Sequence, residues 1–204
     1  MKEKLTYIWE ERKLLILTAA LAAALLSIVW KDFFSDKNRE TAFCAVVVGQ
    51  GYDYDREQLL QEETLAALGL DAQRQQVIVD TSPEPQLDAE GVPPESAYLD
   101  QMKMTTYLTG GEADVVFSDA VVLSHYNGLG AMADLRDVLS DAELAAWDEA
   151  FFTARNKDGE EILCGLRITD GSFSDGGEVY LSVSKKAPHM ELVRDFIRAQ
   201  CGLQ

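Results

Sequence analysis

Polar and aromatic side chains follow two apolar runs that have the composition of buried strands. Ligands of open α/β sheets bind at the edge formed by the carboxyl ends of the strands. Tyrosine offers such a ligand a flat apolar surface with a polar tip, and aspartate offers a fixed negative charge. Turn formation or helix capping is the structural alternative for each residue. The predicted ligand-binding residues are Gln50 and Tyr52, after the run Ala42–Val48, and Ser118 and Asp119, after Ala113–Phe117.

No residue set in the sequence is typical of a catalytic or metal centre. There is no Gly-x-Ser-x-Gly elbow and no Cys-x-x-Cys pair, and the two histidines are far apart. Asp170–Glu178 mixes carboxylates with glycines, but it lacks the ligand spacing of an EF-hand and predicts a hairpin loop. Gly128-x-Gly130 predicts a loop, because no strand leads directly into it. We therefore predict no enzymatic activity, no metal and no cofactor.

The charge of the chain is unevenly distributed. Residues 1–40 carry seven Lys/Arg and six Asp/Glu, which leaves 11 basic and 29 acidic side chains after residue 40, a net charge of −18. Because a region this acidic repels phosphate backbones, nucleic acid is excluded as a partner. The acidity predicts a solubilising surface, with selection of cationic ligands as the functional alternative.

Three cysteines, an odd number, leave at least one thiol unpaired. Cys44 and Cys164 lie in apolar runs and Cys201 near the end of a predicted helix. We expect buried free thiols, since cysteine behaves as a small hydrophobic residue. One disulfide is the alternative, and the sequence does not assign it.

The order of predicted elements after residue 41 indicates an α/β domain. Strands are predicted at 42–48, 75–80 and 113–117, with helices at 55–68 and 95–109 between them. This alternation favours right-handed crossovers and a mainly parallel sheet. Asp55 and Gln58 predict a capping box for the first helix, and Ser140 and Glu143 predict a second one. Further predictions are a hairpin at 151–155 and 161–166, a strand at 178–184 and a helix at 189–201.

An uncharged run from Leu14 to Trp30 precedes this domain. At 1.5 Å per residue it would extend about 26 Å, close to the roughly 30 Å of a hydrocarbon core. Aromatic residues flank it on both sides, and basic residues precede it. These features predict a cytoplasmic N-terminus at 1–13, a transmembrane helix at 14–30, a tether at 31–41 and an extracytoplasmic domain at 42–204. A cleaved signal peptide is the alternative, but the run ends in Ile-Val-Trp-Lys rather than in small residues.

Three segments together resemble the extracellular solute-binding proteins of ABC transporters, which have a periplasmic-binding-protein-like fold. They are VVVGQGYDYD, LTGGEADVVFSD with the following GLGAMADLRDVLSD, and EVYLSVSKKAPHMELVRDFI. The resemblance implies an α/β fold in which two lobes close around a solute. The region after the tether has the size of one lobe. The expected fold is therefore one N-terminal transmembrane helix followed by a single, mainly parallel lobe.

Two functions are compatible with this sequence. The first is a membrane-anchored, solute-binding-like domain that binds a small ligand or another envelope protein. The second is a non-catalytic interaction protein of the cell envelope that has lost the ligand site. A concave apolar pocket at the edge that carries Gln50, Tyr52 and Asp119 would favour the first function, and a flat or filled edge would favour the second.

Overall fold

The computed structural model describes residues 39–88, 94–147, 150–168, 173 and 177–201, together with six positions between 18 and 27. The chain divides into two compact units, Met1–Glu40 and Thr41–Gln204. The prediction of a transmembrane helix is not supported, because none of the described helices is long and apolar enough to cross a membrane. Most of the segment 14–30 lies outside the described residues. The extracytoplasmic location of the domain stays a prediction.

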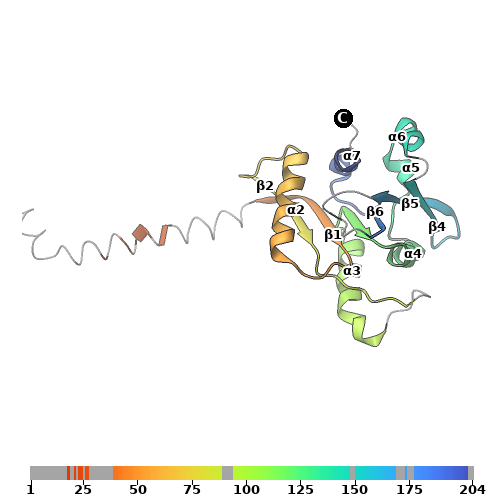
Figure 1. Ribbon diagram of the computed structural model, residues 1–204, viewed down its shortest axis with the longest axis horizontal. Helices are drawn as coiled ribbons and strands as arrows, with labels where there is room; N and C mark the ends of the chain where they lie inside the picture. Colours follow the sequence, from red (N-terminus) through yellow and green to blue (C-terminus); the bar gives the residue numbers. More distant parts are fainter. Residues whose placement is uncertain are drawn as a thin grey trace, which may run out of the picture. The chain divides into compact units, whose positions relative to one another are not determined.

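Six strands of the second unit form one sheet in the order β2-β1-β3-β6-β5-β4 (Figure 1). Apolar β-branched residues dominate the central strands, as is typical of strands buried on both faces. The strands are β1 (Glu40–Val47), β2 (Gln75–Asp80), β3 (Val115–Ser118), β4 (Phe151–Arg155), β5 (Glu161–Ile168) and β6 (Val179–Val183).

The sheet is mixed, so the prediction of a mainly parallel sheet is wrong. β1 and β3 are adjacent and parallel, with Val46 opposite Val116, and β1 lies between β2 and β3. The last strand in the sequence, β6, enters antiparallel beside β3, and β5 and β4 continue antiparallel from it. The β4–β5 hairpin was predicted correctly from its Asn-Lys-Asp-Gly turn.

Helices cover both faces of the sheet, and successive residues of β1 show why. Phe43, Ala45 and Val47 belong to one hydrophobic cluster, with residues of α2 (Tyr54–Ala67), α5 (Leu135–Val138) and α7 (Met190–Gln200). Val46 belongs to the other cluster, with residues of α3 (Tyr98–Gly110) and α4 (Ala120–Gly128). Alternate side chains of a strand point to opposite faces, so both faces of β1 are buried.

Aspartate and serine side chains determine where several helices begin. Asp53 caps α2 through the N–H of Arg56, so the predicted capping box at Asp55 and Gln58 is wrong. Ser140 and Glu143 form the predicted capping box of α6 (Asp141–Ala146). A short 3₁₀ turn, η1 (Glu95–Ala97), precedes α3, which ends at Gly111 in the left-handed conformation, with φ of 72°.

Candidate functional site

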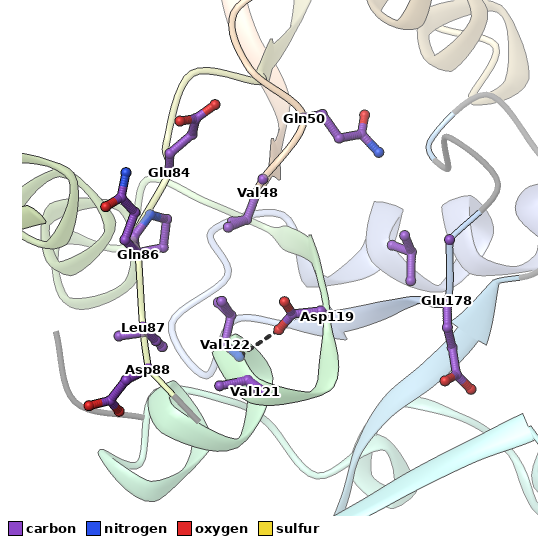
Figure 2. A pocket seen from close by; sticks show the side chains of 14 residues that line it. Val48, Gln50, Glu84, Gln86, Leu87, Asp88, Asp119, Val121, Val122 and Glu178 are labelled. Atoms are coloured by element: carbon purple, nitrogen blue, oxygen red, sulfur yellow. Dashed lines mark hydrogen bonds between the residues drawn. The ribbon is translucent and has the colours of Figure 1, made fainter. Parts of the chain in front are cut away.

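A cavity of about 620 Å³ opens at the carboxyl ends of β1 and β3. Figure 2 shows its labelled side chains, which come from the loop after β1, the loop after β2, the start of α4 and the start of β6. The volume lies in the range of small-molecule sites. The lining residues are Val48, Gly49, Gln50, Glu84, Pro85, Gln86, Leu87, Asp88, Asp119, Val121, Val122, Gly177, Glu178 and Val179.

The loop after β2 forms one wall of the cavity and is held by hydrogen bonds at its start. Glu57 of α2 accepts bonds from the backbone N–H and the hydroxyl of Thr81, at 2.7 and 2.9 Å. The carbonyl of Pro83 accepts a bond from the N–H of Gly49 at 3.3 Å. These bonds link the loops after β1 and β2, so the cavity wall is a fixed part of the domain.

A partly buried ionic cluster holds the start of the same loop from the side of α3. Asp80, at the end of β2, accepts hydrogen bonds from Tyr107 and Ser82 and pairs with Lys103 at 2.6 Å. Burial works to raise the pKa of Asp80, but the hydrogen bonds from Lys103, Ser82 and Tyr107 outweigh it and lower the pKa. Burial and the Asp80 carboxylate raise the pKa of Tyr107, so its phenol stays neutral.

Asp119 caps a helix and also lines the cavity. Its Oδ1 accepts a hydrogen bond from the N–H of Val122 at 2.8 Å, which starts α4 (Figure 2). Its Oδ2 has no hydrogen-bond partner among the residues that the structure describes. One carboxylate oxygen is therefore available to a ligand while the other holds the helix.

Helix α4 positions Asp119 and was not predicted from the sequence. The helix packs closely on the sheet because β5 has a glycine below it. A Cβ on Gly165 would lie 2.5 Å from Cδ2 of Leu123. The close approach brings the first turn of α4, with Val121 and Val122, to the cavity.

Gln50 lines the cavity, and half of its amide is already used. Its Nε2 donates a hydrogen bond to the carbonyl oxygen of Phe173 at 2.9 Å. Its Oε1 is buried and has no hydrogen-bond partner among the described residues. A buried acceptor without a partner costs free energy, but this oxygen has no accessible surface in the cavity.

The other two predicted residues do not line the cavity. Ser118 is buried, with 1% of its surface exposed, and its hydroxyl donates to the carbonyl oxygen of Asp119 at 3.3 Å. Tyr52 lies in the loop after β1 and is 67% exposed. The structure thus brings Gln50 and Asp119 to one cavity and leaves Ser118 and Tyr52 outside its lining.

The residues after β2 are not among the site residues predicted from the sequence, because the proline and acidic residues of segment 81–94 are typical of an exposed loop. Thr81, Pro83 and Pro85 are buried, whereas Glu84 and Gln86 between and after them are exposed. This alternation is the pattern of an extended segment with one face against the protein. It was visible in TSPEPQ and indicates where a cavity wall lies.

The cavity lining is acidic. Glu84, Asp88, Asp119 and Glu178 contribute carboxylates, and none of the described lining residues is Lys or Arg. Glu178 pairs with Arg167 outside the lining at 3.5 Å, which neutralises part of this charge. The carboxylates of Glu84 and Asp119 attract cations and repel phosphates.

Other reactive side chains of the described residues are held in structural roles. The three cysteines are free thiols. Burial and the Asp114 carboxylate raise the pKa of Cys44 to about 12, and burial raises the pKa of Cys164 and Cys201 to about 11. Such thiols stay protonated and unreactive at neutral pH. Within the described part of the chain, no group of three or more His, Cys, Asp or Glu side chains is arranged to hold a metal ion.

The two glycine-containing motifs differ in what the structure shows. Gly128 ends α4 and Gly130 follows in the left-handed conformation, so the motif closes a helix, whereas a dinucleotide fingerprint opens one. Most of the loop Asp170–Glu178 lies outside the described residues.

Comparisons with protein-family models, curated proteins and solved structures find no match. The resemblance to solute-binding proteins therefore rests on the three sequence segments and stays a prediction.

Proposed function

We propose that residues 41–204 form a single-lobe binding domain for a small cationic or polyhydroxyl solute, held at the cavity between the loops after β1, β2 and β3. The observation that carries this proposal is the acidic cavity at the carboxyl edge of the sheet. The concave edge distinguishes the proposal from an interaction protein, for which a flat or filled edge is expected.

One accessible acceptor is available to such a solute. Asp119 is exposed, and its Oδ2 has no partner among the described residues. A protonated amine or a hydroxyl group donates to a carboxylate oxygen of this kind. Val48, Leu87 and Val122 supply apolar surface for the remainder of the solute.

A protein partner that covers the same edge is the second candidate, and one observation favours it. Tyr52 and Tyr54 are 67% and 57% exposed beside this edge, and tyrosine is enriched in protein interfaces. A single lobe leaves a solute open to water on one side, and a partner protein would close that side. The two candidates are compatible when the partner binds over the occupied cavity.

The test is calorimetric titration of the full chain with spermidine, with glucose and with citrate. We expect spermidine or glucose to bind and citrate not to bind. The double variant Asp119→Asn, Glu84→Gln should weaken spermidine binding about tenfold or more, because each exposed carboxylate contributes roughly 1 kcal/mol to a nearby cation. Asparagine still caps a helix, so α4 should form normally.

The control variant is Asp158→Asn, Glu62→Gln, which removes the same charge from exposed positions outside the cavity. It should bind spermidine as the wild type does. Equal weakening in both double variants would show that only the overall charge matters. A failure of spermidine and glucose to bind at millimolar concentration would refute the solute proposal, and a pull-down lost on Tyr52→Ala would then support the protein partner.

A further inference from the structure

A second cavity, of about 450 Å³, lies on the α3–α4 side of the sheet. It is bordered by the last turns of α3, the end of α4, the β4–β5 turn and the residues after β6. It shares no lining residue with the acidic cavity. It is therefore a separate place at which a ligand can be held.

The lining of this second cavity is basic in a strongly acidic domain. Four lysines follow residue 40 in the sequence, and three of them, Lys157, Lys185 and Lys186, line this one cavity. No Asp or Glu is among its lining residues. Among the described residues, no carboxylate forms an ion pair with any of the three. Like charges brought together without counter-charges repel one another, and a bound anion would remove that repulsion.

Two of the lysines are held in place by their surroundings. Lys186 Nζ donates a hydrogen bond to the carbonyl oxygen of Thr109 at 2.7 Å, at the end of α3. The stem of Lys157 packs over Gly130, where a Cβ would lie 2.6 Å from Cδ of the lysine. Lys185 is exposed, and its ammonium has no hydrogen-bond or ion-pair partner among the described residues, so it is the cation best placed to meet a ligand.

The remaining wall of the cavity is apolar. Leu108 and Tyr126 are buried beneath it, and Leu129 at its rim is 62% exposed. The hydroxyl of Tyr126 is buried without a hydrogen-bond partner among the described residues. Inorganic phosphate would leave the apolar wall uncovered, and a neutral hydrocarbon would leave the lysines unpaired. A ligand that satisfies both parts has an apolar body and one anionic group.

We propose that this second cavity binds a small amphipathic carboxylate, with the carboxylate at Lys157 and Lys185 and the apolar body on Leu108, Tyr126 and Leu129. The charge of the whole domain opposes this binding, so the site depends on short-range contacts to these lysines. Binding should accordingly weaken as the salt concentration rises.

The test is calorimetric titration of the full chain with octanoate, octanol and acetate. Octanoate should bind, whereas octanol lacks the charge and acetate lacks the apolar body, so both should bind at least about tenfold more weakly. The variant Lys157→Gln, Lys185→Gln should weaken octanoate binding about tenfold, as expected for two exposed charge contacts. Leu129→Gln should also weaken it, and because this side chain is exposed the fold should not change.

The matched control is Arg74→Gln, Arg155→Gln, which removes two positive charges from exposed positions outside the cavity. It should bind octanoate as the wild type does. Failure of octanoate to bind at millimolar concentration would overturn the proposal. Equal binding of octanol, or equal weakening by the arginine control, would also overturn it, because these results would show that the three lysines do not select the ligand.

Discussion

A buried carboxylate, Asp114, lies just before β3 and accepts hydrogen bonds from β1 and from the residue before α7. We therefore expect its substitution to destabilise the domain. Its side chain has no exposed surface. Its Oδ2 accepts a hydrogen bond from the N–H of Cys44 in β1 at 2.8 Å and lies 3.0 Å from Nδ1 of His189. Its Oδ1 accepts a hydrogen bond from the N–H of His189 at 2.8 Å, immediately before α7. Both oxygens thus accept from backbone N–H groups.

The substitution Asp114→Asn keeps the size of the side chain but removes one acceptor. In either orientation, the amide NH₂ group faces a backbone N–H, so one buried donor loses its partner. A buried unsatisfied group costs about 1–3 kcal/mol, and a charged acceptor lost from the remaining bond adds roughly 1 kcal/mol. We expect a decrease of about 2–4 kcal/mol in the free energy of unfolding, which lowers the melting temperature by about 4–16 °C in a domain of this size.

The assay is urea denaturation of the wild type, Asp114→Asn and Asp53→Asn, followed by circular dichroism. Asp53 is the matched control, because it uses one oxygen to cap α2 and asparagine caps as well as aspartate does. The control should differ from the wild type by less than about 0.5 kcal/mol. If Asp114→Asn is as stable as Asp53→Asn, the two-oxygen network does not stabilise the domain and the reasoning is refuted.

Two further predictions concern the core and the acid response. Val47→Asp should unfold the domain, since Val47 is fully buried and an unpaired buried charge costs several kcal/mol. The control variant Val121→Asp, at a 40% exposed position, should fold. A cooperative melting transition of Val47→Asp would contradict the prediction that this variant unfolds. Burial works to raise the pKa of Glu143, but hydrogen bonds from Arg194, Ser140 and Arg198 outweigh it and hold the pKa well below its usual range. Glu143 therefore stabilises the fold above the pKa of an unfolded glutamate, and this stabilisation is lost as the pH falls toward the folded pKa. Glu143→Gln should cost about 1–2 kcal/mol at pH 7, mostly through the charge lost opposite Arg194 and Arg198, because glutamine can also form a capping box. This cost should shrink near pH 3, and a cost independent of pH would exclude the ionised carboxylate as its source.

The features predicted correctly are those that short sequence patterns specify. The strand at 42–48 is a compact apolar run that ends at Gly49, and β1 follows it closely. The capping box of Ser140 and Glu143 needs only four consecutive residues, and α7 shows a clear apolar face. Each of these patterns can be recognised without knowing what the segment packs against.

The direction of β6 depends on contacts far apart in the sequence, and no local pattern records it. Its composition is that of any buried strand, and the pairing of Val116 with Ser182 joins residues 66 positions apart. The segment Ala120–Gly128 was missed because its nine residues are short for a helix and rich in valine, which is typical of strands. Burial of Leu123 and Tyr126 against the sheet outweighs that propensity.

Two of the four residues singled out from the sequence line the cavity. Gln50 and Asp119 follow the carboxyl ends of β1 and β3, where the cavity opens. Ser118 still belongs to the strand, so its side chain is enclosed, and Tyr52 lies beyond the point where the loop leaves the cavity. A position one residue earlier or later along a strand end changes which face a side chain occupies, and the sequence alone does not resolve that step.

Net charge predicted the charge of only one of the two cavities. Averaged over the residues after position 40, the excess of acid argues for cations everywhere, and the edge that carries Asp119 agrees with it. The fold then gathers Lys157, Lys185 and Lys186 from two separate loops on the α3–α4 side of the sheet. Because charges in water act mainly within about 8–10 Å, a ligand responds to the few side chains around it more than to the total. One helix, α4, has Asp119 at its start and Leu129 just past its end, so the same element positions two cavities of opposite charge.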